Sequence, residues 1–367
     1  MEFNKTLDDI KNYEAGKPIE ELVKDFDFNP KDIIKLASNE NPYGCSEKVK
    51  KTALENLDKI SLYPDDSMHK LKSALAKKFE LKDENIIIGA GSDQVISFCI
   101  GAKCKENSKV LMAKTTFAMY EISAKQVGAK ILKTPSSEHR ISEFEEMYKA
   151  NPDTAVIFLC SPNNPLGECL SIKDIYSFLE KVSKNTLVVI DGAYQEFASF
   201  KDKNKKIVPR DLLEKFENVV YLGTFSKAYG MGGLRVGYGI SSKDIINTLH
   251  KLRPPFNITS LSLACACTAL EDENFIQQTL IKNFEEMEKY EEFLSKNRIN
   301  FTPSYTNFIT LNFSSKYKAS VIAKGLLKKG IILRDLRSYG LNSLRITIGS
   351  KEQNIKVREN LAKFLVY

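Results

Sequence analysis

One lysine in this sequence has neighbours that favour covalent chemistry. Lys227 lies in GTFSKAYGMGGLRVGYGI, residues 223–240, between Ser226 and a run of glycines, and Arg235 follows it. An amine at the end of an apolar strand is desolvated, which lowers its pKa and favours the neutral, nucleophilic form. The small neighbours leave room for a planar ring. We therefore predict that Lys227 forms an imine, although a lysine after a strand is more often an ordinary surface residue.

Other polar residues follow apolar runs elsewhere in the chain. Asp191 ends TLVVID, Tyr194 follows in DGAY, and Asn164 lies in SPNNPLG. An ionised carboxylate at the end of a buried strand is costly unless a cation accompanies it, so Asp191 is a candidate partner for a positively charged group. Taken alone, NNP and DGAY are also ordinary turn sequences.

A glycine-containing turn in IIIGAGSDQ, residues 86–94, is a candidate anion site. The pattern predicts a strand, a turn and the start of a helix, where the backbone N–H groups of Gly91, Ser92 and Asp93 can face an anion. A dinucleotide fingerprint is not indicated, because glutamine occupies position 94, where G-x-G-x-x-G has its third glycine.

These residues require a sheet to position them. Short apolar runs alternate with helical patterns, which predicts an α/β fold. Most runs are continuously apolar, as is typical of strands covered on both faces of a mainly parallel sheet flanked by helices. Ser46 and Ser67 are the expected N-caps of two helices. We predict seven strands, at residues 85–89, 109–113, 129–134, 155–160, 186–191, 219–225 and 235–240.

The pattern changes after Pro254-Pro255. A long helical stretch over about residues 259–297 precedes strand-like FITLNF, helical SVIAKGLLKKG and strand-like SLRITIG. We predict a large domain at residues 30–255 and a smaller α+β domain formed by residues 1–29 and 256–367.

Composition argues against several classes of protein. The 367 residues are 43% hydrophobic and 28% charged, as in soluble enzymes. The net charge of +7 is spread along the chain without a basic block, so we expect no nucleic-acid partner. Seven cysteines, an odd number, lie mostly in apolar runs, which indicates reduced thiols and a cytoplasmic protein. No leader pattern begins the chain, and no apolar run reaches the ~20 residues of a membrane span.

No metal site or hydrolase motif is expected. His69, His139 and His250 are far apart and form no H-E-x-x-H, and Cys265 and Cys267 form a C-x-C without a second pair. The G-x-S-x-G sequence of serine hydrolases does not occur.

The sequence T-F-S-K-A-Y-G-x-G-G at residues 224–233, followed by Arg235, closely resembles the lysine-attachment motif of pyridoxal-phosphate aminotransferases of fold type I. The resemblance extends over about residues 36–349, and the histidinol-phosphate aminotransferase branch is the most similar. Its specificity lies in a set of residues that occur in the family's order: Asn164, Asp191, Tyr194, Lys227 and Arg235.

The resemblance implies pyridoxal phosphate as the cofactor. It implies that Lys227 holds the cofactor as a Schiff base and acts as general acid and base, and that Asp191 pairs with the protonated ring nitrogen. It further implies that Tyr194 and Asn164 bind the ring oxygen. Ser226 and Arg235 resemble the family's phosphate ligands, which the turn at Gly91, Ser92 and Asp93 would complete.

Two aromatic residues have implied roles around the cofactor. Phe117, in KTTFAMY, falls where the family stacks an aromatic side chain on the ring, at a position where many members of this branch have tyrosine. A core phenylalanine is the alternative. Tyr63, in LYPDDS, resembles the tyrosine that reaches the phosphate from the neighbouring subunit, which implies a homodimer.

The residues implied for the substrate are more dispersed. Arg345 resembles the arginine that binds the substrate carboxylate, and Arg334 resembles a second arginine of the histidinol-phosphate branch. Two guanidinium groups suit a phosphate dianion, although Arg334 could instead pair with Asp335. Asn41 and Tyr43, in LASNENPYG, are implied to line the substrate pocket together with Asn164.

The implied reaction is a ping-pong transamination of histidine biosynthesis. It converts L-histidinol phosphate and 2-oxoglutarate to imidazole acetol phosphate and glutamate. Aromatic amino-acid aminotransferases and threonine-phosphate decarboxylases are the enzymatic alternatives. A ligand-sensing domain of a transcription regulator is the non-enzymatic one, and it is disfavoured because the roughly 35 residues before LASNENPYG are too few for a typical DNA-binding domain.

Overall fold

The computed structural model describes residues 4–8, 10 and 28–365. Its larger sheet has seven strands in the order β2-β8-β7-β6-β5-β3-β4. Neighbouring strands are parallel except at β8, which is antiparallel to both β2 and β7. The predicted seven-stranded, mainly parallel sheet is therefore confirmed. The strands are β2 (Ile86–Gly89), β3 (Lys109–Met112), β4 (Lys130–Lys133), β5 (Thr154–Cys160), β6 (Leu187–Asp191), β7 (Val219–Thr224) and β8 (Gly237–Ile240).

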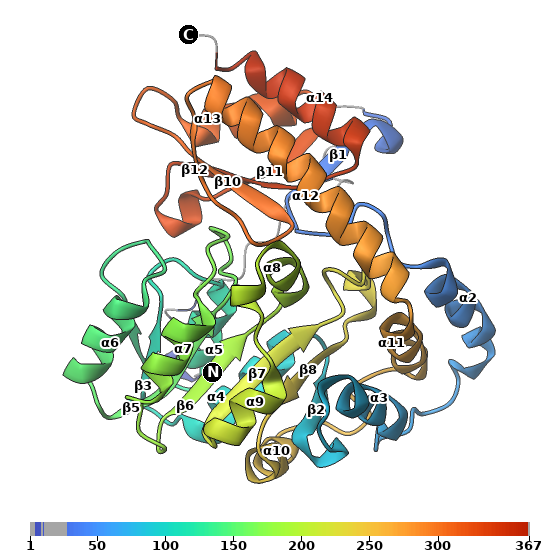
Figure 1. Cartoon of the computed structure of the whole chain (residues 1–367), viewed down its shortest axis with the longest axis vertical. Helices are drawn as coiled ribbons and strands as arrows, with labels where there is room; N and C mark the ends of the chain where they lie inside the picture. Colours follow the sequence, from blue (N-terminus) through green and yellow to red (C-terminus); the bar gives the residue numbers. More distant parts are fainter. Residues whose placement is uncertain (1–3, 9, 11–27, 366–367) are drawn as a thin grey trace.

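Two apolar cores cover the two faces of this sheet. Successive residues of a strand point to opposite faces, so Val188 lies in one core and Val189 in the other. This double burial explains the continuous apolar runs of the sequence. Helices pack on both faces (Figure 1). The helices that accompany the sheet are α2 (Glu47–Glu55), α3 (His69–Phe79), α4 (Ser92–Lys103), α5 (Ala118–Gln126), α6 (Ile141–Ala150), α7 (Ile172–Leu179), α8 (Gln195–Lys201), α9 (Pro209–Lys215), α10 (Lys243–His250) and α11 (Ser260–Glu271).

The two predicted N-caps have different outcomes. Ser46 caps α2, where its hydroxyl accepts a hydrogen bond from the Val49 N–H. Ser67 does not cap α3, because the cap residue is Met68 in a left-handed conformation. The Ser67 hydroxyl still accepts a hydrogen bond from the His69 N–H at the first turn.

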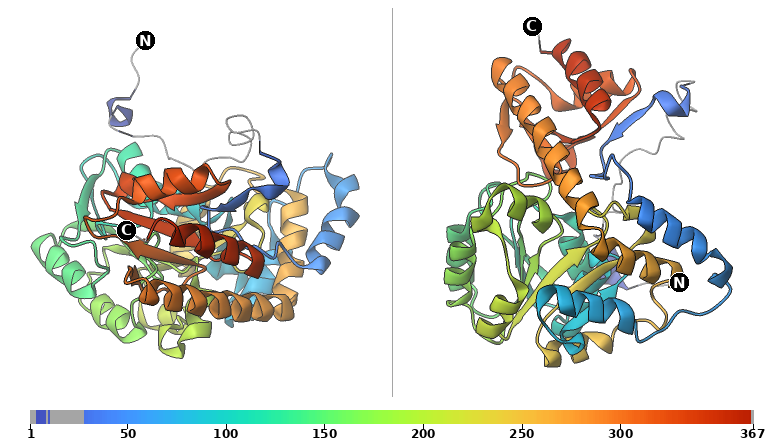
Figure 2. Two further views of the ribbon diagram at one scale, coloured as in Figure 1. Left: turned by 90° about the horizontal axis from the view of Figure 1, so that it is seen from above. Right: turned by 45° about the vertical axis from the view of Figure 1, so that its right-hand side comes forward.

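A smaller sheet of five strands, in the order β1-β11-β12-β10-β9, lies on one side of the larger layer (Figures 1 and 2). The predicted helix over residues 259–297 is in fact two helices that meet at Asp272. The C-terminal half of the second one packs on the small sheet through Met287, Tyr290 and Leu294. The elements are β1 (Ile34–Leu36), α12 (Glu273–Lys296), β9 (Asn300–Thr302), β10 (Phe308–Asn312), α13 (Ala319–Leu327), β11 (Ile331–Asp335), β12 (Ser343–Thr347) and α14 (Lys351–Ala362).

The predicted domain boundaries at residues 30 and 255 were wrong. Strand β1 pairs in parallel with β11, so it belongs to the small sheet. Helix α11 places Cys265 and Ala266 in the core of the large layer. The Thr6 hydroxyl, near the amino terminus, donates to the Gln126 carbonyl at the end of α5. The chain thus crosses between the layers after β1 and along α12, and most of residues 1–29 lie outside the described residues.

None of the helices in the described part of the chain has the length and apolarity that a membrane crossing requires. The same residues contain no group of three or more histidine, cysteine, aspartate or glutamate side chains that could hold a metal ion.

Candidate active site

The carboxyl ends of β5, β6 and β7 meet at a cavity of about 280 Å³ that also touches the small sheet. Ligands of open α/β sheets bind at this edge, because loops rather than strands occupy it. Most of the predicted site residues meet here. Those that line the cavity are Gly91, Ser92, Asp93, Phe117, Asn164, Asp191, Tyr194, Ser226, Lys227, Arg235, Arg334 and Arg345.

Lys227 follows β7 and is held beside Tyr194. Its Nζ lies 5.7 Å from the centre of the Tyr194 ring and donates a hydrogen bond of 3.4 Å to the Ser38 carbonyl. Burial lowers the pKa of Lys227 to about 8, and the positive charge of Arg345 acts in the same direction. A large part of the amine is therefore neutral, and nucleophilic, just above neutral pH.

Asp191 ends β6 and is 3% exposed. The Tyr120 hydroxyl donates to its Oδ2 at 2.6 Å, and the Ala193 N–H donates to its Oδ1 at 3.0 Å. Burial raises the pKa of Asp191 to about 6, although both hydrogen bonds lower it. A cationic ring nitrogen beside this carboxylate would stabilise the ionised form, which burial otherwise disfavours.

Tyr194 and Asn164 both have a donor left for a ligand. The Tyr194 hydroxyl oxygen accepts a hydrogen bond of 2.8 Å from the Asn39 side-chain amide, so its own proton remains available. Arg345 has only donors, so the Asn164 atom that it contacts at 2.6 Å is the amide oxygen. The Asn164 NH₂ group is then free to donate. Two donors on one cavity suit an anionic ring oxygen.

The predicted anion site is built around the start of α4. Gly91 precedes this helix with a φ of +78°, and Ser92 is its first residue. Arg235 donates to the Ser226 hydroxyl at 3.3 Å and forms an ion pair of 3.4 Å with Asp93. The arrangement combines a helix N-terminus, a guanidinium group and a hydroxyl, which together can bind a phosphate.

A second glycine lets β8 approach the same turn. A Cβ atom at Gly237 would lie 2.2 Å from the Ser92 backbone nitrogen. A Cβ atom at Gly91 would lie 2.5 Å from Arg235 Nη2. No room exists for a side chain at either position, so the glycines bring the backbone N–H groups and the guanidinium together.

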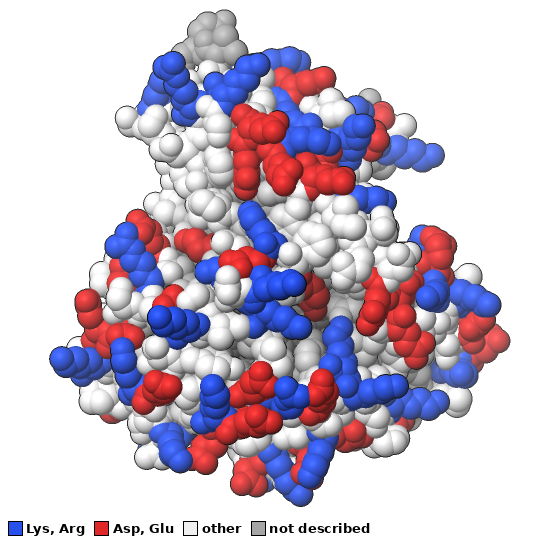
Figure 3. Space-filling model, in the orientation of Figure 1, with Lys and Arg blue, Asp and Glu red and all other residues white. Residues whose placement is uncertain are grey.

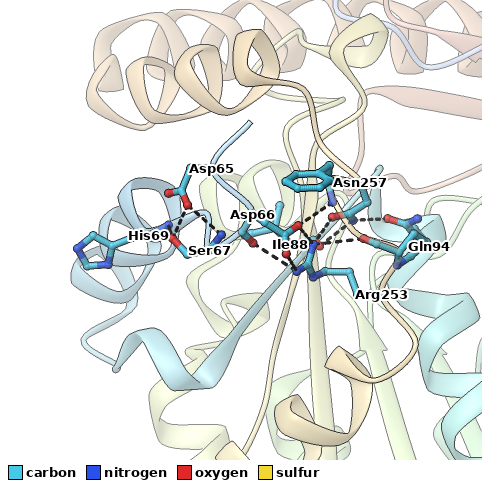
Figure 4. Close-up of polar contacts among 10 residues, drawn as sticks. Asp65, Asp66, Ser67, His69, Ile88, Gln94, Arg253 and Asn257 are labelled. Carbon is cyan, nitrogen blue, oxygen red and sulfur yellow. Dashed lines mark hydrogen bonds and ion pairs between the residues drawn. The ribbon is translucent and has the colours of Figure 1, made fainter. Parts of the chain in front are cut away.

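A polar network connects this turn to the segment before α3 (Figure 4). Arg253 holds the Asp66 carboxylate through two hydrogen bonds of 2.8 Å and donates to Asn257 Oδ1 at 2.9 Å. The Asn257 amide donates to Gln94 Oε1 at 2.6 Å, and this oxygen also accepts from the Ala90 N–H at 2.8 Å. The network fixes the backbone of the anion-binding turn from outside the cavity.

Arg334 and Arg345 are direct partners on the antiparallel strands β11 and β12, so their side chains share one face of the sheet. Both line the cavity. The alternative pairing of Arg334 with Asp335 is not observed, because Asp335 forms an ion pair of 2.5 Å with Arg337. Like charges opposite each other are unfavourable unless an anion lies between them or beside them.

Three predicted residues lie outside the cavity lining. Tyr63 is 84% exposed, and its ring centre lies 4.8 Å from that of Phe256 on the surface. Asn41 donates to the Ala228 carbonyl, one residue after Lys227, and accepts from the Tyr43 N–H. Asn41 therefore ties its segment to the residue after Lys227, and neither Asn41 nor Tyr43 is among the residues that line the cavity.

Three further residues of the site, Tyr120, Asn39 and Tyr339, were not predicted from the sequence. Tyr120 lies one helical turn after Phe117, and Asn39 lies in the LASNENPYG segment, so both were close to predicted residues. Tyr339 lines the cavity from a turn that follows β11. The sequence carries no signal for it, because only the packing of the small sheet brings this turn to Lys227.

The comparison with known proteins agrees with this geometry. Residues 31–361 match the model of the aminotransferase class I and II family. The chain belongs to this family. It is similar to a histidinol-phosphate aminotransferase from Aliarcobacter butzleri (strain RM4018), with 57% identity over all of this chain and 99% of the relative. It is also similar to a histidinol-phosphate aminotransferase from Campylobacter concisus (strain 13826), with 56% identity over the full length of both.

Among solved structures, the structure of this aminotransferase is similar to that of a histidinol-phosphate aminotransferase from Sinorhizobium meliloti in complex with pyridoxal-5'-phosphate. The TM-score is 0.90 at 21% identity, and the match covers 99% of this chain and 97% of the other. At this identity the likeness establishes the fold, which is that of fold type I. The predicted fold class and membership of the histidinol-phosphate aminotransferase branch are thus confirmed.

Proposed function

We propose that this aminotransferase uses pyridoxal phosphate to convert L-histidinol phosphate and 2-oxoglutarate to imidazole acetol phosphate and glutamate. The observation that carries the choice of substrate is the direct pairing of Arg334 with Arg345 across two strands at the cavity. Two guanidinium groups on one face call for an anion of high charge, such as a phosphate dianion. The identity of 52–57% over nearly the full length to histidinol-phosphate aminotransferases of several bacteria supports the same choice.

The residues of the cavity fit the proposed cofactor. Lys227 offers a buried amine, Asp191 a buried acid for the ring nitrogen, and the start of α4 a phosphate site. Pyridoxal phosphate, when bound, supplies an electron-accepting ring that stabilises negative charge at the substrate Cα. Phe117 lies in the cavity wall, where it can stack on a ring, and Asn164 and Tyr194 can donate to a ring oxygen.

Lys227 is the proposed general base and acid. The freed Lys227 amine can take the proton from the substrate Cα as a general base. It can then donate a proton as a general acid in the step that leads to the product. Its lowered pKa, about 8, suits both steps near neutral pH. Arg345 and Arg334 hold the substrate anion, and the same pair can hold the carboxylates of glutamate and 2-oxoglutarate in the second half of the cycle.

We also propose a cytoplasmic homodimer in which Tyr63 reaches the partner's phosphate site. Support comes from a group of exposed apolar side chains around Tyr63, since such groups mark protein interfaces. Leu54, Leu57, Ile60 and Leu62 belong to the segment that leads to Tyr63, and the Phe256 ring contacts the Tyr63 ring.

Steady-state assays of the purified enzyme with three substrates test the proposal. Histidinol phosphate with 2-oxoglutarate should give glutamate at a kcat/KM at least about tenfold above that of phenylalanine. The variant Arg334→Met should lose this preference and keep its activity toward phenylalanine. A preference for phenylalanine would make the enzyme an aromatic aminotransferase. Release of carbon dioxide from threonine phosphate without an oxo acid would make it a decarboxylase.

A further inference from the structure

A second and larger cavity lies behind the active site. Its volume is about 750 Å³, and it lies between the end of α3, the helix α8 and the first turns of α12. We name it the α8–α12 cavity. Its wall includes the aromatic side chains of Phe79, Phe200, Tyr221, Tyr229 and Tyr238. The active-site cavity is a separate one, whose lining shares no residue with it.

Several polar groups of this wall lack partners. Tyr221 and Tyr238 are 3% and 2% exposed, yet neither hydroxyl has a hydrogen bond to any residue that the structure describes. Gln195 is 6% exposed, and its Oε1 has no partner either. Gln195 Oε1 is thus a buried acceptor without a partner among the described residues, and the two tyrosines line the same cavity, so a polar molecule bound there would supply the missing hydrogen bonds.

The carboxylate of Glu196 is the strongest of these groups. It is half-buried, its own backbone N–H contributes a hydrogen bond, and no other residue in the described part of the chain donates to it or forms an ion pair with it. Lys78, the cation that acts on it electrostatically, donates instead to the Tyr229 hydroxyl at 2.6 Å. Burial raises the pKa of Glu196. A positively charged donor would stabilise the ionised carboxylate, which burial disfavours at this position.

The mouth of the cavity has the opposite character. Lys203 and Lys206 line it and are exposed, and one carboxylate, Glu273, lies there as well. Several basic side chains lie close together in the space-filling view, in the region where Figure 1 places α8 (Figure 3). The cavity therefore combines the half-buried carboxylate of Glu196 with the exposed ammonium groups of Lys203 and Lys206.

We propose that the α8–α12 cavity is a second binding site for a small zwitterion of the amino-acid class. Its ammonium group binds Glu196 and the tyrosine hydroxyls, its side chain packs on the aromatic wall, and its carboxylate faces Lys203 and Lys206. Aromatic faces also attract an ammonium ion, which strengthens the inner end of the site.

The site shares elements with the catalytic centre. Gln195 and Glu196 begin α8 directly after Tyr194. The Tyr221 ring lies against Gly192, where an added Cβ would be 2.5 Å from the Tyr221 hydroxyl, and Gly192 follows Asp191. Helix α12 lines the cavity with its first turns and packs on the small sheet with its last ones. An occupant would therefore contact the helix that runs from the large layer to the small sheet.

Isothermal titration with a panel of the standard amino acids tests the proposal. The protein is holoenzyme whose cofactor has been fixed to Lys227 by borohydride, so that the active site takes no substrate amine. At least one amino acid should bind, and its decarboxylated and deaminated analogues should bind more weakly. Glu196→Gln should weaken binding about tenfold or more, since hydrogen bonds to charged groups contribute that much. Tyr221→Phe is a second, smaller change to the same wall.

Arg345→Ala, in the other cavity, is the matched control and should leave this affinity unchanged. Thermal unfolding of each variant shows that it is folded. The absence of binding by the whole panel would mean that the cavity holds water only and would overturn the proposal. Binding that persists in both Glu196→Gln and Tyr221→Phe, or that disappears in Arg345→Ala, would overturn it too. The result is independent of which substrate the active site prefers.

Discussion

Burial and the hydroxyl group of Tyr120 change the pKa of the Asp191 carboxyl in opposite directions. Burial raises the pKa of this carboxyl to about 6, and the hydrogen bond from Tyr120 is the largest of the effects that lower it. A charged Asp191 is the form that can pair with a cationic ring nitrogen. Tyr120 is therefore a positioning residue, because it keeps the carboxylate both ionised and oriented.

We predict that Tyr120→Phe lowers kcat about tenfold, since a hydrogen bond to a charged group is lost. The pH profile should separate this role from a merely structural one. The acidic limb of kcat/KM should move to higher pH, because the pKa of Asp191 rises without its donor. A variant with reduced stability but an unchanged acidic limb would contradict this assignment.

The amine of Lys227 gives a second prediction. Burial lowers its pKa in the folded, cofactor-free protein to about 8, against 10.5 for an unperturbed lysine. The rate at which pyridoxal phosphate attaches to Lys227 should therefore rise with pH through a midpoint near 8. The folded pKa lies below the unfolded one, so the associated stability is present above pH 10.5 and is lost as the pH falls through about 8. An attachment midpoint near 10.5 would contradict the effect of burial.

Residues within short motifs could be predicted from the sequence, and residues that depend on packing could not. Lys227, Asp191 and Asn164 follow apolar strands, so their position at one sheet edge was foreseeable. Tyr120 reaches Asp191 across 71 positions, and Asn39 reaches Tyr194 across 155. No local pattern encodes such pairs.

At the scale of elements, the turn between β2 and α4 depends on how closely β8 approaches it. Gly237→Ala would place a Cβ atom 2.2 Å from the Ser92 nitrogen, so the turn would have to move. We predict at least about tenfold weaker binding of pyridoxal phosphate, because one or two phosphate hydrogen bonds would be lost. Titration of the cofactor-free protein by absorbance measures this.

Gly233→Ala is the matched control for this substitution. It lies in the same glycine-rich segment, and an added Cβ would have nothing within 4 Å. Its affinity for the cofactor should stay near that of the wild type. Equal losses in both variants would mean that the segment needs flexibility rather than the close approach at Gly237.

The elements that the sequence predicted are the long apolar ones. All seven strands of the large sheet were predicted, and most of them are buried on both faces, although β4 at the edge of the sheet is not. Strand β1 has only three residues and gains its place by pairing with β11, about 300 positions away. Such a strand has no pattern of its own, which is why the domain boundary at residue 30 was wrong.

At the scale of the whole molecule, the segment that carries Tyr63 is tied to the phosphate site. Asp66 connects it through Arg253 and Asn257 to Gln94 beside the anion-binding turn (Figure 4). Tyr63 itself points to the surface and is 84% exposed. A dimer that covers this surface would place the partner's Tyr63 and the supporting network at the same cofactor.

Mixed dimers test this arrangement. We predict that Lys227→Ala and Tyr63→Ala subunits, each weakly active or inactive alone, recover activity when unfolded together and refolded. One site of each mixed dimer then contains Lys227 and receives Tyr63 from the other subunit. No recovery, with mixed dimers shown to form, would mean that Tyr63 acts within its own subunit.

The visible spectrum of the holoenzyme during one half-reaction tests the central claim most directly. Histidinol phosphate is added without an oxo acid, and the band of the lysine-linked cofactor is followed. The band should disappear as the aminated cofactor forms, and it should return when 2-oxoglutarate is added. Lys227→Ala should show neither change while its far-UV circular dichroism stays that of the wild type. A wild-type spectrum that histidinol phosphate leaves unchanged, or a Lys227→Ala protein that completes the half-reaction, would contradict the assignment of this site.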